Sequence, residues 1–488
     1  MSKIIEKINS VSLSNPDKIA LSDGFDLQVS YANLNKEINK ISQILQKHNL
    51  QSLAILVENS PAWIAFDLAC LNSKITNTPI PHFFCEKQIE NLIKESCLQA
   101  VLVDNSSSYF SEKNNKMELT IFNKKFQLIF LENQVKSNLN KIAKITFTSG
   151  STSSAKGVCL TKENLENVVF SLAKNLQSEN LKANLSVLPL AILLENIAGV
   201  YVSLVLEAVS IIPPLSEVGI TNSSSLNLEK FCQIINQTKP ESIILVPELA
   251  KVLIALTSFQ KINNPNFKFI ALGGAKIAND LLIAAQKLNL PIYQGYGLSE
   301  VASVVSLNNR NSNKIGSVGK ILPHLEVKIA TDGEILIKGN LAKSYSNLEN
   351  SSVDGDGFYK TGDVGRIDED GFLFIDGRKK DIFITSFGRN VSPAWVESEL
   401  LKSQIILQAC VFGEAMPKNV AIITSNCDLK IVESEVAKIN SSLPDYVQIG
   451  KIILTKEPFS LKNNMLTGNG RIRREAILNF YQQQIINL

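Results

Sequence analysis

The feature that most constrains the fold of this chain is a repeated alternation of short apolar runs, polar turns and longer helical patterns. Residues 53–57 form such a run, a polar turn follows at 58–61, and apolar residues then recur with helical spacing from 63 to 71. Further short runs beside helical patterns lie at 243–246, 267–272 and 292–294. A short continuous apolar run fits a strand buried on both faces, and parallel sheets covered by helices need such strands. The pattern therefore predicts an α/β fold.

The length of the chain and a change of pattern divide it into two predicted domains. At 488 residues it exceeds what one hydrophobic core usually supports. Alternating apolar residues and Asp-Gly turns at 334–338 and 365–374 predict hairpins, and thus a β-rich subdomain. We therefore expect a large N-terminal domain of layered α/β sheets at 1–377, which includes this subdomain. A small mobile α+β domain at 378–488 would follow, near the usual domain size.

Charge and cysteine content exclude several classes of protein. Forty-nine basic and 46 acidic side chains give a net charge of +3, which argues against a nucleic-acid surface or a polybasic membrane patch. The seven cysteines are scattered, without Cys-x-x-Cys pairs, so a reducing cytoplasm fits better than a disulfide framework or a zinc site. Residues 1–9 show no secretory pattern, and the apolar stretch 197–206 is too short to span a bilayer. We expect that stretch to be a buried core helix, and peripheral membrane contact stays open.

Serine and threonine side chains crowd the segment 147–158, which reads Phe-Thr-Ser-Gly-Ser-Thr-Ser-Ser-Ala-Lys-Gly-Val. The apolar run 142–147 predicts a strand before it, and 160–172 has helical spacing, so backbone N–H groups could face an anion between strand and helix. This composition suits the polyphosphate of ATP. The common nucleotide loop needs Gly-Lys followed by Ser or Thr, which this segment lacks. The alternative is an ordinary polar turn.

Four further segments follow this loop in order. They are Leu272-Gly273-Gly274-Ala275, the run Tyr293-Gln294-Gly295-Tyr296-Gly297-Leu298-Ser299-Glu300, Tyr359-Lys360-Thr361-Gly362-Asp363, and Gly377-Arg378-Lys379-Lys380-Asp381 with Gly388, Val391 and Pro393 after it. Each match is short, but the joint order and spacing are specific. From about Ile145 to Arg474 the chain resembles the adenylate-forming, AMP-binding superfamily, in its branch of acyl-CoA synthetases and fatty-acid–CoA ligases.

The resemblance implies a nucleotide-binding ligase that uses ATP, Mg²⁺ and CoA, the last as acceptor substrate. In that family a carboxylate attacks the α-phosphate of ATP and expels pyrophosphate, and a thiol then displaces AMP from the acyl-adenylate. Such chemistry needs charge neutralisation and in-line positioning more than a base. A hydrophobic, fatty carboxylic acid is the expected substrate, which would place the enzyme in fatty-acid metabolism. The alternatives are a ligase that loads an acyl carrier protein and a non-catalytic binder of nucleotide and acyl groups.

The resemblance also assigns roles to individual residues. The implied catalytic residues are Lys156, Glu300, Arg378 and Arg471. The implied nucleotide- and thiol-binding residues are Thr148, Ser149, Gly150, Ser151, Thr152, Gly274, Ala275, Tyr296, Gly297, Ser299, Asp363 and Gly388. Glu300 and Thr152 would hold Mg²⁺, which prefers oxygen ligands. Tyr296 would cover the adenine and Asp363 would bind the ribose, although the first could be a core aromatic and the second a turn residue.

The chain departs from the family pattern at several positions. Arg471 stands where the family carries a Lys that reaches the α-phosphate; it keeps the charge in a larger, forked group, and Lys462 is the alternative. Ile192 replaces a common His or aromatic gate, which predicts a more apolar acyl channel. Trp395 stands where a Glu is common, so we expect an ion pair to be missing there. Lys380 falls at the hinge of the family, where a few residues absorb the rotation of the small domain.

Overall fold

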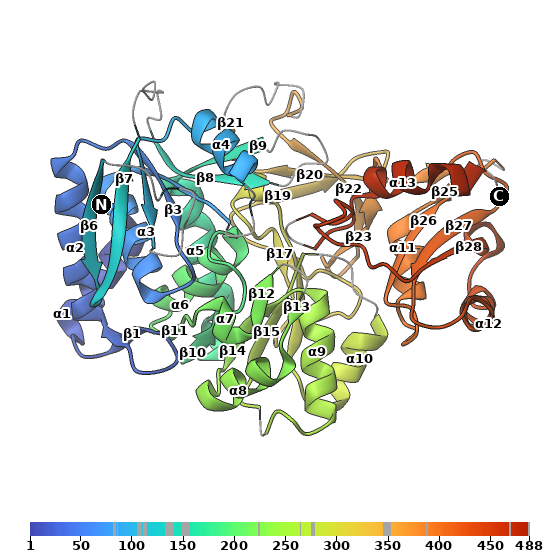
Figure 1. Cartoon of the computed structure of the whole chain (residues 1–488), viewed down its shortest axis with the longest axis horizontal. Coiled ribbons are helices and arrows are strands. Elements are labelled where there is room, and N and C mark those ends of the chain that lie inside the picture. The colour runs from blue at the N-terminus through green and yellow to red at the C-terminus, as the bar shows by residue number, and fades with distance from the viewer. Residues whose placement is uncertain are drawn as a thin grey trace.

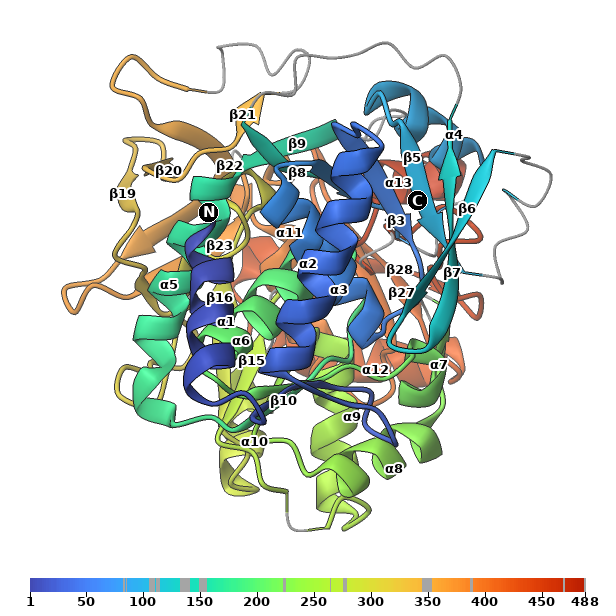
Figure 2. The ribbon, with the colours of Figure 1, turned by 90° about the vertical axis from the view of Figure 1, so that its left-hand side faces the viewer.

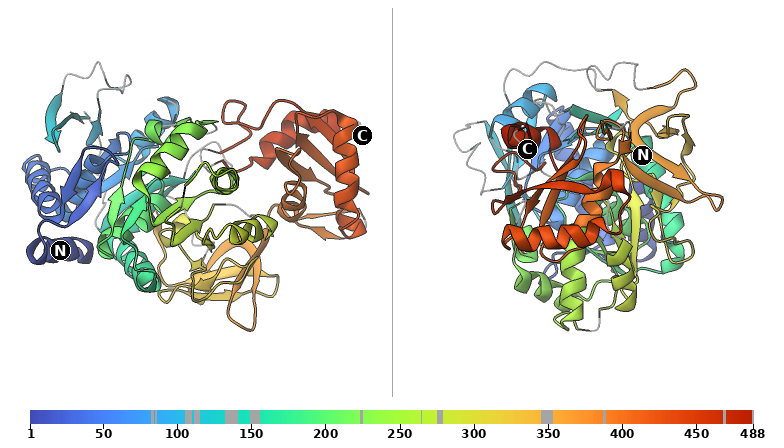
Figure 3. Two further views of the ribbon diagram at one scale, coloured as in Figure 1. Left: turned by 90° about the horizontal axis from the view of Figure 1, so that it is seen from below. Right: turned by 90° about the vertical axis from the view of Figure 1, so that its right-hand side faces the viewer.

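The computed structural model describes the whole chain except residues 82–83, 85, 105–109, 111–114, 132–140, 149–155, 223–224, 264, 275–278, 345–352, 387–388, 468–469 and 487–488. Two large sheets organise the N-terminal part, and the small C-terminal part lies at the opposite end of the long axis from the N-terminus (Figures 1 and 3).

The first large sheet has eight strands. In spatial order they are β21 (Lys343–Ser344), β9 (Lys156–Thr161), β8 (Ile142–Thr148), β4 (Thr76–Pro79), β3 (Ser52–Leu56), β5 (Ala100–Val103), β7 (Lys124–Phe130) and β6 (Lys116–Ile121). β8, β4, β3 and β5 run parallel, whereas β9 and β7 pair antiparallel with their neighbours. The predicted strand at 53–57 is thereby confirmed.

The second large sheet has nine strands. In spatial order they are β18 (Lys320–Ile321), β17 (Ser306–Leu307), β16 (Ile292–Tyr296), β15 (Phe269–Leu272), β14 (Ser242–Leu245), β10 (Ala183–Leu185), β11 (Val209–Ile211), β1 (Ile19–Ser22) and β2 (Gln28–Ser30). The three predicted runs at 243–246, 267–272 and 292–294 are confirmed as the neighbouring parallel strands β14, β15 and β16.

Helices cover both sheets and fill the space between them (Figure 2). The helices between the sheets are α1 (Lys3–Ser14), α2 (Tyr31–Lys47), α3 (Pro61–Ser73), α5 (Lys162–Leu176), η3 (Leu194–Tyr201) and α6 (Val202–Val205). The outer face of the eight-stranded sheet packs on α4 (Glu86–Glu95). The outer face of the nine-stranded sheet packs on α8 (Leu228–Thr238), α9 (Pro247–Ser258) and α10 (Asn279–Lys287). Strands buried on both faces explain why their sequences are continuous apolar runs.

Short elements complete this part of the chain. They are η2 (Gln177–Glu179), α7 (Leu215–Val218), η4 (Ser299–Val301) and the hairpin of β12 (Ile220–Asn222) and β13 (Ser225–Leu226). The predicted core helix at 197–206 is confirmed as η3 and α6, and η3 has π-helical geometry. Such π-helical turns occur frequently at functional sites.

The predicted β-rich subdomain is an antiparallel sheet of β19 (Glu326–Ile329), β20 (Glu334–Lys338), β22 (Tyr359–Ile367) and β23 (Leu373–Arg378). The hairpin of β22 and β23 turns at Asp368 to Gly371, where Gly371 adopts φ +81° and its N–H donates to the carbonyl of Asp368. A positive φ is accessible to glycine without a steric penalty, so the Asp-Gly signal of the sequence has a direct physical cause here.

The C-terminal part is an α+β unit, as expected. It contains β24 (Phe383–Ile384), β25 (Asn390–Val391), α11 (Pro393–Leu400), β26 (Gln408–Phe412), β27 (Asn419–Thr424), α12 (Leu429–Asn440), η6 (Asp445–Val447), β28 (Ile449–Thr455) and α13 (Arg474–Ile486). One face of β26 and β27 packs on α11 and α12, and the other on α13. Each core cluster among the described residues lies entirely before residue 376 or entirely after residue 382.

One expectation needs correction. The segment after the hydroxyl-rich loop is the strand β9, antiparallel to β8, so the loop joins two strands and not a strand and a helix. Val158, Cys159 and Leu160 are buried in this strand, and a short apolar run cannot be assigned to strand or helix from periodicity alone. Two residues after Trp395, Glu397 pairs with Arg474 at 2.6 Å.

In the part of the chain that the structure describes, no helix combines the length and the apolar character needed to cross a lipid bilayer.

Candidate active site

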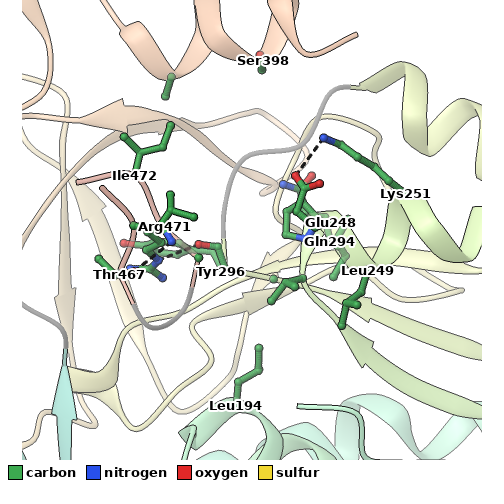
Figure 4. A pocket seen from close by; sticks show the side chains of 18 of the residues that line it. Leu194, Glu248, Leu249, Lys251, Gln294, Tyr296, Ser398, Thr467, Arg471 and Ile472 are labelled. Carbon is green, nitrogen blue, oxygen red and sulfur yellow. Dashed lines mark hydrogen bonds and ion pairs between the residues drawn. The ribbon is translucent and has the colours of Figure 1, made fainter. Parts of the chain in front are cut away.

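A cavity of about 2750 Å³ opens between the two parts of the chain and extends into the N-terminal part. Its walls include the ends of β15 and β16, the helix η3, the end of β23, and the segment that leads into α13. Figure 4 shows side chains from both parts pointing into it, with Tyr296 and Arg471 close together. Residues of four predicted motifs, 272–275, 293–300, 359–363 and 377–381, therefore meet at one place, although they are far apart in sequence.

Three predicted residues form a compact polar cluster on this wall. Asp363 on β22 lies directly opposite Arg378 on β23, because the two strands pair antiparallel in that register. The Nε of Arg378 lies 2.8 Å from Oδ1 of Asp363, and the hydroxyl of Tyr296 donates to Oδ2 at 2.5 Å. Burial raises the pKa of Asp363 despite the neighbouring guanidinium of Arg378. Each carboxylate oxygen carries two acceptor sites, so Asp363 can still accept further hydrogen bonds.

The backbone beside this cluster needs glycine at 297. A Cβ atom on Gly297 would lie 1.6 Å from the carbonyl oxygen of Ser303, which no L side chain could tolerate. Ser299 and Glu300 follow in the short helix η4, and both line the cavity. The motif 293–300 therefore combines a close backbone approach with a carboxylate placed at the cavity wall.

The carboxylate of Glu300 is the candidate metal ligand within the described residues. Burial raises the pKa of Tyr359, and the charge of Glu300 raises it further; at Arg471 the same charge opposes the lowering of the pKa by burial. The described residues contain no group of three or more His, Cys, Asp or Glu side chains that could hold a metal ion. Mg²⁺ is commonly bound by one or two carboxylates together with substrate phosphates and water, and a single Glu fits that mode.

Arg471 reaches the site from the C-terminal part of the chain. Its Nε donates to the carbonyl oxygen of Gly274 at 3.0 Å. A local turn fixes its backbone, because the N–H of Thr467 donates to the carbonyl of Arg471 at 2.7 Å and the N–H of Arg471 donates to the Thr467 hydroxyl at 3.1 Å. Lys462, the alternative residue, is not among the described residues that line the cavity.

The structure describes only part of the predicted phosphate loop. Ser149, Gly150, Ser151, Thr152, Ala275 and Gly388 lie outside the described residues. The backbones of Thr148 and Lys156 are opposite each other at the end of β8 and the start of β9. These strands place the two ends of the loop side by side, and Phe147 lines the cavity.

A buried ionic network joins β8 to its neighbouring elements, and no sequence motif indicates it. The Nζ of Lys144 on β8 lies 2.9 Å from Oδ2 of Asp67 on α3, with exposed fractions of 2% and 1%. Lys144 also donates to Asn196 of η3, and the hydroxyl of Tyr201 donates to Asp67 at 2.7 Å. Asn77 on β4 completes the cluster by donating to Oδ1 of Asp67. A Lys inside the apolar run 142–147 was the available signal.

This network joins the strand that enters the loop to the helix that lines the cavity. Lys144 is four residues before Thr148, and Asn196 and Tyr201 lie at the two ends of η3. Breaking a buried ion pair leaves an uncompensated charge, so the position of β8 relative to η3 is strongly fixed.

The cavity continues as an inner channel between the nine-stranded sheet and the helices α5, η3 and α6. Leu194, Ala198, Val202 and Leu206 line it at a spacing of four residues, which places them along one side of the helix. The other described residues that line the inner channel are Leu172, Leu176, Leu181, Asn184, Ser203, Ser242, Ile244, Phe269 and Ala271. Ile192 also lines the cavity, just before the helix.

Comparison with known proteins places this geometry in a family. A family profile described as "AMP-binding enzyme" matches residues 10–345, and one described as "AMP-binding enzyme C-terminal domain" matches residues 380–488. The chain belongs to the AMP-binding enzymes. The site of this AMP-binding enzyme thus lies between the two matched regions.

Several curated proteins are similar to parts of this AMP-binding enzyme. A long-chain-fatty-acid-CoA ligase of Mycobacterium bovis, FadD15, is 44% identical over 155 residues, which are 31% of this chain and 26% of that protein. A 2-succinylbenzoate-CoA ligase of Listeria innocua is 30% identical over 286 residues, 58% of either chain. A probable 4-coumarate-CoA ligase of Dictyostelium discoideum is 27% identical and covers 85% of this chain and 84% of that protein. The chain spans only about a quarter of the fatty-acid ligase and under three fifths of the succinylbenzoate ligase.

Solved structures share the fold of the whole chain. The o-succinylbenzoate CoA synthetase of Bacillus subtilis, solved with its acyl-adenylate intermediate, has a TM-score of 0.78 and 22% identity, covering 96% of this chain and 97% of that one. An anthranilate CoA ligase in complex with anthranoyl-AMP has a TM-score of 0.82 and 16% identity, covering 99% and 98%. The predicted architecture of a large N-terminal domain with mixed sheets and a small C-terminal domain is thereby confirmed.

Proposed function

We propose that this AMP-binding enzyme activates a hydrophobic, fatty carboxylic acid with ATP and transfers the acyl group to CoA. The observation that carries the proposal is the inner channel, which begins near Gly273 and Gly274 beside Tyr296 and continues between a sheet and a helix. Leu194 marks its entrance, because the side chain would lie 3.4 Å from a Cβ atom on Gly273. The described walls are largely apolar and carry no charged side chain. An extended acyl chain matches such a space better than a single aromatic ring does.

The residues of the site fit ATP as a substrate. In our proposal Asp363 accepts hydrogen bonds from the ribose hydroxyls, Arg378 holds Asp363 in place, and Tyr296 packs on the adenine. A carboxylate oxygen of the acid attacks the α-phosphorus, the bond to the β-phosphate breaks, and pyrophosphate leaves. Arg471 neutralises charge on the α-phosphate in this step, since a guanidinium can bind two phosphate oxygens. A bound Mg²⁺, held by Glu300 and phosphate oxygens, would neutralise further negative charge.

The thiol of CoA then attacks the acyl carbon, and AMP leaves with the carboxylate oxygen. We propose that the chain rotates at Lys380 between the two steps, with the domain boundary at 377 and 378. Thr148, Ser149, Gly150, Ser151, Thr152, Lys156, Gly297, Ser299 and Ala275 stay proposed nucleotide contacts, and Gly388 a proposed thiol contact. Six free cysteines among the described residues suit the cytoplasm as the place where the reaction occurs.

The test is pyrophosphate release with ATP and Mg²⁺ across fatty acids of graded length, 2-succinylbenzoate, 4-coumarate and amino acids, each with and without CoA. We expect release with fatty acids, and stimulation by CoA. Release with an aromatic acid alone would contradict the fatty substrate. Release that needs an acyl carrier protein would change the acceptor, and silence of the whole panel with ATP still bound would favour a non-catalytic role.

A variant separates the channel from the rest of the site. Ala198→Phe places a large side chain on the wall of the inner channel, one helical turn beyond Leu194. We expect a loss of at least tenfold in kcat/KM for long acids, with short acids unchanged as the internal control. An equal loss for all lengths would show that the variant disturbs the fold, and no loss would show that the acid binds elsewhere.

A further inference from the structure

Three polar side chains, Asn184, Ser203 and Ser242, interrupt the apolar wall of the inner channel, and two of them form a pair. Asn184 on β10 and Ser242 on β14 are direct partners in neighbouring parallel strands. The Ser242 hydroxyl donates to Oδ1 of Asn184 at 2.9 Å. The two residues are 3% and 4% exposed, and both line the channel. Polar groups are costly to bury unless they are hydrogen-bonded, so their presence among leucines needs an explanation.

One hydrogen-bond donor of this pair has no partner. The Nδ2 of Asn184 is buried and makes no hydrogen bond to any described residue. The Oε1 of Glu195 is also buried and unpaired among the described residues. A Cβ atom on Gly199 would lie 2.5 Å from that oxygen and 3.5 Å from Asn184 Nδ2, so both unpaired groups lie beside this glycine. An unsatisfied buried donor destabilises the folded protein, and a bound acceptor would remove that penalty.

The surroundings define the chemistry of that acceptor. The described residues of the inner channel include no Lys or Arg. A substrate with a second carboxylate at its far end would therefore find no cationic partner there. Burial raises the pKa of Glu195 to about 8, so this neighbour is mostly protonated at neutral pH and can donate as well. A neutral oxygen is the matching group, either a hydroxyl or a carbonyl.

The position along the channel follows from the sheet. Ser242 is paired with Phe269 on β15, and Phe269 precedes Gly273 by four residues. At about 3.3 Å per strand residue, Ser242 lies roughly 13 Å from Gly273. Gly273 is beside the place where the carboxylate would react, so the polar pair is deep in the channel.

We propose that Asn184 and Ser242 form a subsite for a neutral oxygen substituent, a hydroxyl or a carbonyl, in the middle or distal part of the acyl chain. This inference rests on the proposed function, because it assigns the inner channel to the acid. Hydroxy or oxo fatty acids are then better substrates than unsubstituted acids of equal length. The amide of Asn184 donates to the oxygen of the substrate, and Ser242 holds the amide in place.

The experiment compares kcat/KM for unsubstituted acids and for acids of equal length that carry one hydroxyl or oxo group at successive positions. We expect a preference for a substituent in the middle or distal part of the chain, and roughly tenfold loss of that preference in Asn184→Leu, as the removal of one buried hydrogen bond predicts. Ser242→Ala is a smaller change that should lower the same ratio. Ser210→Ala is the matched control. Ser210 on β11 is the strand partner of Asn184 on the other side, and it is buried but does not line the cavity. Its hydroxyl makes no hydrogen bond to any described residue.

The outcomes separate the two proposals. A wild-type enzyme that activates unsubstituted acids and shows no preference for any substituent overturns the subsite and leaves the proposed function intact. An unchanged preference in both Asn184→Leu and Ser242→Ala also overturns the subsite, since an internal water would then satisfy the amide. An equal loss of preference in Ser210→Ala overturns the subsite as well. Absence of pyrophosphate release with every acid refutes the proposed function itself.

Discussion

The buried carboxyl of Glu195 should make the stability of this protein depend on pH. Glu195 has no exposed surface, and Oε2 accepts one hydrogen bond, from the N–H of Leu188 at 3.1 Å. Desolvation raises its pKa from the usual 4.5 to about 8. The variant Glu195→Gln keeps the size and an acceptor oxygen but cannot ionise.

The sign and size of the effect follow from proton linkage. Between pH 4.5 and 8 the folded state holds a proton on Glu195 that the unfolded state has released, so the free energy of unfolding falls as pH rises through this window. The loss is complete above pH 8, and at 1.36 kcal/mol per pH unit it amounts to about 5 kcal/mol. Glu195→Gln should lack this loss. The two proteins should be about equally stable near pH 4.5, and the variant more stable above pH 8.

Urea unfolding of both proteins, followed by tryptophan fluorescence between pH 5 and 8.5, measures this difference. Trp63 is 1% exposed in the core that contains η3, so it reports on the relevant part of the chain. The expected result is a gap that widens steadily with pH. Parallel stability curves, or a gap that narrows with pH, would contradict a raised pKa of Glu195 in the folded protein.

Three further variants test other parts of the site. Lys144→Met should lower the free energy of unfolding by about 3 to 5 kcal/mol because it leaves Asp67 charged and buried. The double variant Lys144→Met, Asp67→Leu should recover part of that free energy. A loss below about 1 kcal/mol for Lys144→Met in urea unfolding would contradict the importance of the buried pair. Gly297→Ala should weaken ATP binding roughly tenfold or more in titration calorimetry, since its Cβ meets a backbone carbonyl, and unchanged affinity would contradict the close approach. Arg471→Lys should slow pyrophosphate release by roughly tenfold, because the hydrogen bond to the Gly274 carbonyl is lost. Acyl transfer to CoA should be unchanged. Faster pyrophosphate release would show that the natural residue attenuates the enzyme.

Much of the fold could be predicted from the sequence because local patterns had a single structural solution. Short apolar runs such as 243–246 can be buried on both faces only inside a covered parallel sheet, and Asp-Gly turns such as Asp370-Gly371 require a positive φ that glycine supplies. The strand β9 was assigned wrongly because Val158 to Leu160 continues directly into α5, and periodicity does not separate a short buried strand from the start of a helix.

The site was predictable only where side chains form motifs with fixed spacing. Tyr296, Asp363 and Arg378 were identified from such motifs, and the structure brings them into hydrogen-bond contact. The network of Lys144 and Asp67 was not, because its members come from separate elements and no local pattern links them. The pairing of Asn184 with Ser242 likewise depends on the order of strands in the sheet, which a sequence does not display.

In the proposed reaction the carboxylate of the acid attacks the α-phosphorus of ATP. The decisive experiment uses a fatty acid whose carboxylate oxygens carry a heavy isotope, incubates it with the enzyme, ATP, Mg²⁺ and CoA, and follows the nucleotide product by mass spectrometry. We expect acyl-CoA together with AMP that contains one labelled oxygen, since that oxygen leaves with AMP when the thiol displaces it. Unlabelled AMP, or ADP in its place, would contradict an acyl-adenylate and the proposed role of the site.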